Sequence, residues 1–209
     1  MHTRREDLRV MAEVLLFHHI QGLTPGVIAL ADQLRAAGHT VHTPDLYGGR
    51  TFASIEEGAA FAQGDDAPDV AALADAAAAE LPAQLVYAGI SAGVVHAQRL
   101  AQTRAGAAGA VLMESCLPIT GQWAFGDWPA GVPVQIHGMD DDEYFAGEGD
   151  VEAAREIVKI VGPSAELFVY SGEGHLFEDN SLGSYDPSAT ALLIERITVF
   201  LGCIEEDGS

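Results

Sequence analysis

The fold is indicated first by the pentapeptide Gly89-Ile90-Ser91-Ala92-Gly93, which matches the pattern G-x-S-x-G. An apolar, strand-like segment (residues 84–88) precedes it, and a helical pattern (residues 92–102) follows it. A serine on the sharp turn between a strand and a helix is lifted above the sheet, and only small neighbours fit in such a turn. This setting predicts that Ser91 is a nucleophile rather than part of an ordinary tight turn.

The segments around this turn alternate between short apolar strands and helices. Thr24-Pro25 is typical of a helix start, and Gly38 of the end of that helix. A further helix is alanine-rich, with Val70, Leu73, Ala77 and Leu81 on one face. Strands are predicted at residues 14–17, 39–43, 84–88, 110–113, 132–137 and 167–170. The pattern predicts an α/β fold, a single domain over residues 1–209, whose mostly parallel sheet of about six or seven strands carries helices on both faces.

Composition bounds the class of protein. Hydrophobic residues make up 48% of the 209 residues, which excludes a disordered chain. No apolar run approaches the roughly 18 residues of a membrane span. The polar start, Met1–Glu6, lacks the apolar segment of a signal peptide. Cys116 and Cys203 are too few for a disulfide framework and are expected to be buried small residues, so a reduced, cytoplasmic location is expected.

The charge balance narrows the list of partners. Ten Lys and Arg residues against 31 Asp and Glu residues give a formal net charge of −21. Such a surface repels the phosphates of nucleic acids and of anionic membranes, so neither is expected as a partner. The sequence has no phosphate-binding loop, no dinucleotide glycine fingerprint and no Cys/His cluster. No cofactor and no metal are therefore expected.

A serine nucleophile needs a base and an orienting acid. His175 is the candidate base, because it stands in a glycine-rich loop directly after the last predicted strand. Candidate acids follow two other strands, and the residues alone leave the choice open between Glu114, Asp140, Asp141 and Asp142. The loop at residues 114–131 carries Trp123, Phe125 and Trp128, either as a packed surface loop or as a wall over an apolar substrate.

Several segments together resemble the dienelactone hydrolase family of the α/β-hydrolase superfamily, over nearly the whole chain. They are His18-His19-Ile20-Gln21-Gly22-Leu23, Thr43-Pro44-Asp45-Leu46-Tyr47-Gly48-Gly49, the Ser91 turn and Gly174-His175-Leu176-Phe177. The resemblance implies an α/β-hydrolase-type sheet. It also implies that the acid is Asp142, five residues after His137 and shortly before Phe145. It further implies that the backbone amides of Ile20 and Ala92 form the oxyanion hole.

The chain departs from that family at positions that matter for chemistry. Ser91 stands where the dienelactone hydrolases have a cysteine, and His19 where they have a glutamate. Asp179 stands four residues after His175, where an arginine is expected, and Arg50 is the one cation in the segment after Gly49. Since nothing here matches the family's arginine clamp for a substrate carboxylate, the resemblance does not imply an anionic substrate.

The adjacent pair His18-His19 needs separate treatment. Neighbouring residues on a strand point to opposite faces, so the two imidazoles are poorly placed to chelate one metal ion. One is expected to pack in the core while the other faces the site. His19 is the candidate for a pocket residue, together with the aromatic residues of the 114–131 loop.

These features predict a serine hydrolase with Ser91, His175 and Asp142 as its catalytic triad. The expected substrate is a small molecule, a compact neutral ester or lactone cleaved through an acyl-enzyme. Acyl transfer to an acceptor other than water is one alternative. The other is a catalytically silent ligand-binding protein, against which the intact set of three residues argues. A homodimer stays open as the assembly.

Overall fold

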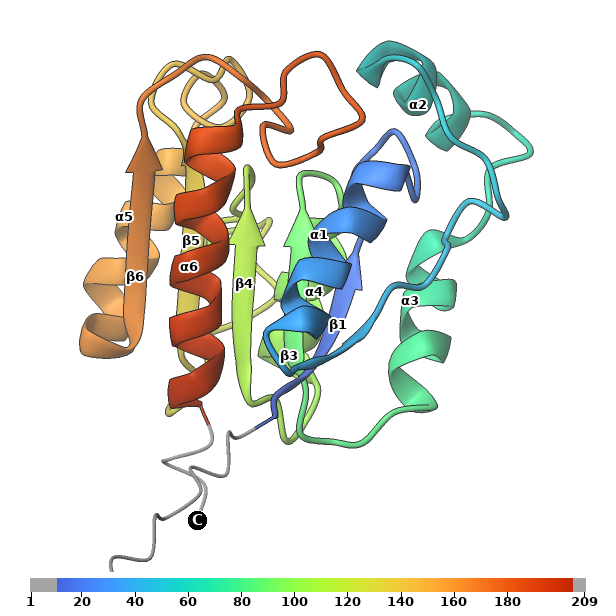
Figure 1. Ribbon diagram of the computed structural model, residues 1–209. Coiled ribbons are helices and arrows are strands. Elements are labelled where there is room, and N and C mark those ends of the chain that lie inside the picture. The colour runs from blue at the N-terminus through green and yellow to red at the C-terminus, as the bar shows by residue number, and fades with distance from the viewer. Residues whose placement is uncertain (1–10, 205–209) are drawn as a thin grey trace, which may run out of the picture.

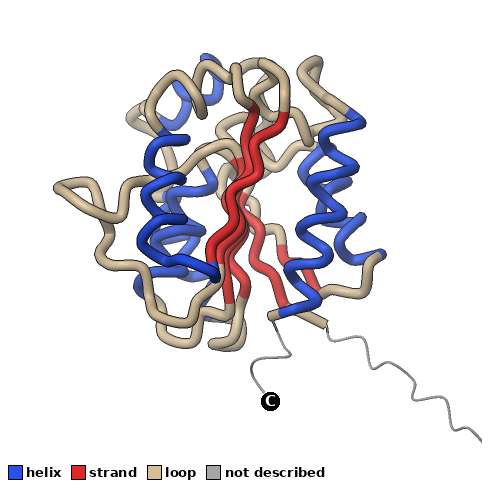
Figure 2. The backbone as a smooth tube through the Cα atoms, turned by 90° about the vertical axis from the view of Figure 1, so that its left-hand side faces the viewer, coloured by secondary structure: helices blue, strands red, loops and turns tan. Residues whose placement is uncertain are grey.

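A computed structural model describes residues 11–204, which form a sheet between two layers of helices (Figures 1 and 2). The six strands lie in the order β2-β1-β3-β4-β5-β6, and every neighbouring pair is parallel within the described part of the chain. The predicted α/β class and strand number are thus confirmed, whereas the polar start, Met1–Glu6, lies outside the described residues. The strands are β1 (Glu13–Phe17), β2 (Thr40–His42), β3 (Val86–Ile90), β4 (Gly109–Met113), β5 (Val134–Met139) and β6 (Ala165–Tyr170).

Helices cover both faces of the sheet, as Figure 2 shows with the strands edge-on between them. Side chains alternate along each strand, so Leu15 and Phe17 of β1 join one core cluster while Val14 and Leu16 join the other. The first cluster packs against α3, α4 and α5, and the second against α1 and α6. The helices are α1 (Pro25–Ala36), α2 (Ile55–Ala62), α3 (Val70–Ala79), α4 (Gly93–Thr103), α5 (Asp150–Val161) and α6 (Pro187–Cys203), with a 3-10 turn at Gly162–Ser164.

Side-chain caps fix where several helices begin. The Thr24 hydroxyl accepts the Val27 N–H at 3.2 Å, and Pro25 occupies the first helical position, as the sequence predicts. Asp186 caps α6 by accepting two backbone N–H groups, and Asp69 caps α3 in the same way with one. Such caps satisfy amide groups that the first turn of a helix leaves without partners.

One expectation about burial is wrong, and in α3 burial does not follow the apolar face of the sequence pattern. The buried residues of α3 are Ala74 and Ala78, whereas Leu73 is 42% exposed. Cys116 is buried as expected, but Cys203 is exposed on the last turn of α6. Among residues 11–204, none of the helices combines the length and apolar character that crossing a bilayer requires.

The parallel sheet gathers the candidate residues at one edge. Ser91 follows β3, Asp142 follows β5 and His175 follows β6, each within a few residues of the strand. In a parallel sheet all of these carboxyl ends point the same way, toward the upper edge in Figure 1. The α2 helix lies at this edge as well (Figure 1).

Candidate active site

The turn that carries Ser91 is sharp and strained. Ser91 has a φ of 49°, in the left-handed region that non-glycine residues rarely adopt. Glycine is required on both sides of Ser91. A Cβ at Gly89 would collide with the backbone of Gly93 and Val94, and a Cβ at Gly93 would collide with the backbone of Phe17 and His18. The Ser91 N–H donates to the Met113 carbonyl of β4 at 2.7 Å, which fixes the turn to the sheet.

A chain of hydrogen bonds links three side chains from separate loops. The Nε2 atom of His175 lies 2.9 Å from the Ser91 Oγ, and its Nδ1 atom lies 2.7 Å from Oδ2 of Asp142. Because the carboxylate only accepts, Nδ1 carries the proton and Nε2 accepts from the Ser91 hydroxyl. The Asp142 side chain is fully buried and that of His175 is 8% exposed. This arrangement can take a proton from Ser91 and stabilise the imidazolium that results.

The acidic residues next to Asp142 in the sequence do not bond to His175. Asp140 accepts the Gly172 N–H at 2.9 Å, and Asp141 is exposed. Asp142 turns inward, with its Oδ1 accepting the Tyr144 N–H at 2.9 Å. Phe145 anchors this loop: its ring is buried against Gly138, where a Cβ would overlap it.

Glu114, the other candidate acid, anchors the loop that follows His175. Its carboxyl oxygens accept the backbone N–H groups of Leu176 and Phe177 at 2.7 and 2.9 Å. Burial and the nearby Glu178 carboxylate raise the pKa of Glu114 well above its usual range. Glu114 (φ 60°) and Leu176 (φ 61°) also have a left-handed backbone conformation. Within residues 11–204, the non-glycine residues with a positive φ are these two and Ser91. All three lie around His175, so backbone strain is concentrated at the candidate site.

Glu114, Asp142 and His175 also offer ligand atoms that lie within 4.8 Å of one another, a spacing compatible with a metal ion. Their hydrogen bonds favour another explanation. Both nitrogens of His175 are engaged by Asp142 and Ser91, and both carboxyl oxygens of Glu114 accept backbone N–H groups. The donor atoms are thus already used by protein partners, and the cluster fits a triad with its anchor better than a metal site.

The residues expected at the oxyanion hole lie in two segments that each follow a strand of the sheet. Ala92 is the first residue after Ser91 and directly precedes α4, and Ile20 lies in the loop after β1. Both are half-buried. Within the described residues, neither backbone N–H donates a hydrogen bond to another protein group. Two partly accessible amides without a protein acceptor are suited to receive a negatively charged oxygen.

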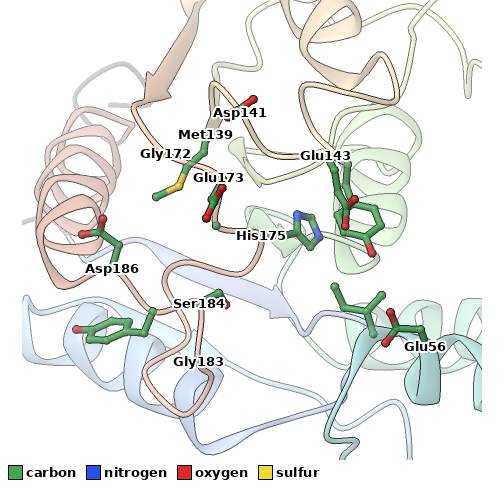
Figure 3. A pocket seen from close by; sticks show the side chains of 14 residues that line it. Glu56, Met139, Asp141, Glu143, Gly172, Glu173, His175, Gly183, Ser184 and Asp186 are labelled. Atoms are coloured by element: carbon green, nitrogen blue, oxygen red, sulfur yellow. The ribbon is translucent and has the colours of Figure 1, made fainter.

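A cavity of about 760 Å³ adjoins His175 and is rich in acidic groups (Figure 3). Tyr144 lines the cavity, and its ring centroid lies 4.5 Å from that of His175; sequence reasoning assigned no role to this residue. None of its 14 lining residues, all within the described range, is Lys or Arg. Five are acidic: Glu56, Asp141, Glu143, Glu173 and Asp186.

The residues expected to wall the pocket do not line this cavity. His19 is completely buried, so that expectation is wrong: its ring nitrogens bond to the Asp179 carboxylate and to the Gln21 N–H. Trp128 is part of the core and donates from Nε1 to the Val132 carbonyl at 2.8 Å. Trp123 is 72% exposed and Phe125 is half-buried, and neither is among the lining residues.

Two arginines, Arg50 and Arg99, also make their contacts away from the cavity. The Arg50 guanidinium lies over the ring of Phe61, 5.2 Å from its centroid. Arg99 pairs with Asp75 at 2.7 Å. Neither lines the cavity, so the negative charge of its acidic residues is not offset by these cations.

No known family model matches the sequence, and comparison with curated proteins gives no significant match. Solved structures are similar across nearly the whole chain. A Klebsiella pneumoniae protein assigned as a dienelactone hydrolase has a TM-score of 0.71 and 19% identity, covering 95% of this chain and 90% of that one. A dienelactone hydrolase-like promiscuous phosphotriesterase, P91, from metagenomic libraries has a TM-score of 0.68 and 19% identity, covering 91% and 85%. The Thermogutta terrifontis esterase Est2 has a TM-score of 0.62 and 18% identity, covering 92% and 84%. The chain therefore has the α/β-hydrolase fold, in a form similar to that of dienelactone hydrolase-like structures.

Proposed function

We propose that this protein is a serine hydrolase that cleaves a small uncharged ester or lactone through an acyl-enzyme intermediate. The observation that carries the proposal is the hydrogen-bonded chain from Ser91 through His175 to the buried Asp142. It agrees with the fold, because the nucleophile, the acid and the histidine follow strands β3, β5 and β6, in the chain order typical of α/β-hydrolases.

The reaction proceeds in two half-reactions. Ser91 Oγ attacks the ester carbonyl while its proton passes to Nε2 of His175, and the amides of Ile20 and Ala92 stabilise the oxyanion that forms. Collapse of this intermediate breaks the C–O bond, and His175 returns the proton to the leaving alcohol. A water molecule then attacks the acyl-enzyme while its proton passes to His175. Breakage of the bond between the acyl carbon and Ser91 Oγ releases the acid, and His175 returns the proton to Ser91 Oγ. With a lactone the alcohol stays attached to the acyl group.

Covalent labelling tests the proposal directly. A fluorophosphonate probe reacts with an activated serine, so the purified protein is expected to gain one adduct, which peptide mass spectrometry locates at Ser91. A parallel assay with p-nitrophenyl acetate measures turnover. A catalytically silent protein gives neither adduct nor turnover, and an acyltransferase gives the adduct but turns over mainly when an acceptor alcohol is added. Either of these results replaces the hydrolase assignment.

Substrate charge gives a second prediction. The cavity presents five acidic residues and neither Lys nor Arg, so a carboxylate on the substrate is repelled and finds no bidentate partner. We expect kcat/KM for a neutral ester to exceed that of its carboxylate analogue by at least about tenfold at low salt. Because added salt screens the long-range part of the repulsion, the ratio is expected to fall as ionic strength rises.

A charge-neutralising variant provides the control. Replacing Glu56, Glu143 and Glu173 together by glutamine is expected to raise kcat/KM for the anionic ester more than for the neutral one. Glu195→Gln removes an exposed carboxylate from α6 that does not line the cavity, and it is expected to leave the ratio unchanged. A wild-type preference for the anionic ester would contradict the prediction.

A further inference from the structure

The loop that follows β1, residues 18–22, is held by its neighbours on several sides. Gln21 exchanges two hydrogen bonds with the backbone of Phe52, each 3.0 Å long. Gly58 of α2 packs so closely on the Ile20 carbonyl that a Cβ there would collide with it. The contribution expected of Ile20 is its backbone amide, and the position of that amide depends on how firmly this loop is held.

His19 connects this loop to the loop that carries His175. Its Nε2 lies 2.9 Å from Oδ2 of Asp179, and both side chains are fully buried. Its Nδ1 accepts the Gln21 N–H at 3.2 Å, which leaves the ring proton on Nε2 for donation to Asp179. The His19 imidazole thus links the backbone of Gln21, the residue after Ile20, to the carboxylate of Asp179, four residues after His175.

Asp179 sits in a site built to hold a carboxylate. Besides His19, it accepts from the Thr24 hydroxyl and from the N–H and hydroxyl of Ser181. Gly26 leaves the space for it, because a Cβ there would overlap the carboxylate. Burial opposes ionisation, but the hydrogen bonds from His19, Ser181 and Thr24 outweigh it and lower the pKa of Asp179 to about 2.

His18 supports the same loop from the other side. Its Nδ1 donates to the His19 carbonyl at 2.8 Å, and its Nε2 accepts the Leu46 N–H at 3.1 Å. Burial lowers the pKa of His18, which keeps Nε2 free to accept. The two adjacent histidines thus bond to different neighbouring loops. His19 is the one that reaches the loop of the catalytic base.

We propose that the His19–Asp179 pair is a positioning device that fixes the Ile20 amide relative to Ser91 and His175. This inference rests on the proposed function, since it assigns a purpose to the amide only if Ser91 forms an acyl-enzyme. Two of the positions at which the chain departs from the dienelactone hydrolase pattern, His19 and Asp179, are in direct contact. The pair therefore forms a buried polar link between these two loops.

The test compares an ester with its thionoester, in which sulfur replaces the carbonyl oxygen. Sulfur is larger and a weaker acceptor, so a well-placed amide pair strongly favours the oxygen substrate. For Asp179→Asn we expect kcat for p-nitrophenyl acetate to fall about tenfold to hundredfold with KM nearly unchanged, since a displaced donor weakens transition-state binding. The ester-to-thionoester ratio of kcat/KM is expected to fall by about tenfold as well.

Three further variants keep the test decisive if Asp179→Asn does not fold. His19→Gln retains an N–H donor toward Asp179 and is expected to keep more of kcat and of the ratio than His19→Ala. Asp69→Ala removes the cap of α3, far along the chain from the site, and serves as a control that lowers the melting temperature without changing the ratio.

The outcomes separate this inference from the proposed function. Absence of fluorophosphonate labelling in the wild-type protein ends the proposed function itself. If the wild type is labelled and turns over, an unchanged kcat in Asp179→Asn overturns the positioning role. A loss of kcat with an unchanged ester-to-thionoester ratio also overturns it, because the damage would then lie outside the oxyanion hole.

Discussion

Ser91→Ala is expected to lower kcat for p-nitrophenyl acetate by about four to six orders of magnitude, because no acyl-enzyme can form without the hydroxyl. The fold is expected to survive. The Ser91 side chain is bonded to His175, and the N–H that ties the turn to Met113 is kept in alanine. Burst kinetics and fluorophosphonate labelling measure the loss, and circular dichroism checks the fold.

Ser184→Ala is the matched control for this variant. Ser184 lines the cavity that adjoins His175, but its hydroxyl bonds weakly to the Leu176 carbonyl, at 3.4 Å, and does not contact His175 through a hydrogen bond within the described residues. Its loss is expected to change kcat by less than tenfold. Turnover that is undiminished in Ser91→Ala would rule out the serine mechanism. Ser91→Cys is expected to exceed Ser91→Ala in activity, given the resemblance to enzymes with a cysteine nucleophile.

Sequence reasoning could locate the edge of the sheet at which chemistry is possible. Short apolar strands alternating with helices specify a parallel sheet, and every residue that follows a strand then lies at one edge. This pattern alone predicts that Ser91 and His175 lie at the same edge of the sheet. The two glycines around Ser91 gave a further signal, because the close approach of other backbone groups leaves no room for side chains there.

The choice among the consecutive acids could not be made from the pattern alone. Asp140, Asp141 and Asp142 have the same chemistry, and their directions depend on how the loop packs. In the structure Phe145 is anchored against Gly138, which turns Asp142 inward, and only the resemblance to a family pointed to that residue in advance. Composition likewise gave no sign that Trp128 packs in the core rather than over a substrate.

The expectation for His19 failed for a clear physical reason. Alternation of side chains holds along a strand, but β1 ends at Phe17, before the two histidines begin. Beyond that point each imidazole follows its own hydrogen bonds, and both are buried. A signal was nevertheless present in the sequence, since His19 and Asp179 both depart from the family pattern. A histidine stands where the family has a glutamate, and an aspartate stands where an arginine is expected. Such paired departures indicate contact between the two positions.

The acidic cavity was expected only in part. The net charge predicts repulsion of anions, and Asp179 stands only four residues after His175 in the sequence. Asp179 instead points away into its hydrogen-bonded site, fully buried. The negative groups at the cavity come from α2 and from the loops after β5 and β6, segments far apart in sequence whose side chains meet only in the fold (Figure 3).

Asp142→Asn is expected to lower kcat by about 10⁴-fold while leaving KM and the melting temperature little changed. The asparagine side chain can present its NH₂ group to Nδ1 of His175, which then becomes an acceptor and carries its proton on Nε2 instead. In that tautomer the imidazole cannot accept the Ser91 proton. Asp141→Asn and Asp140→Asn change the same charge in the same loop, and each is expected to keep most of the activity because neither side chain contacts His175.

Glu114 requires a separate readout, because its carboxyl group holds the backbone after His175 and its loss is also expected to reduce activity. Proton NMR distinguishes the two roles through the low-field signal of an Nδ1–H proton bonded to a carboxylate. That signal is expected to be present in the wild type and in Glu114→Gln, since the 2.7 Å bond from His175 to Asp142 is intact in both. It is expected to disappear in Asp142→Asn. The reverse pattern, with the signal lost in Glu114→Gln and kept in Asp142→Asn, would assign the orienting acid to Glu114, at the end of β4.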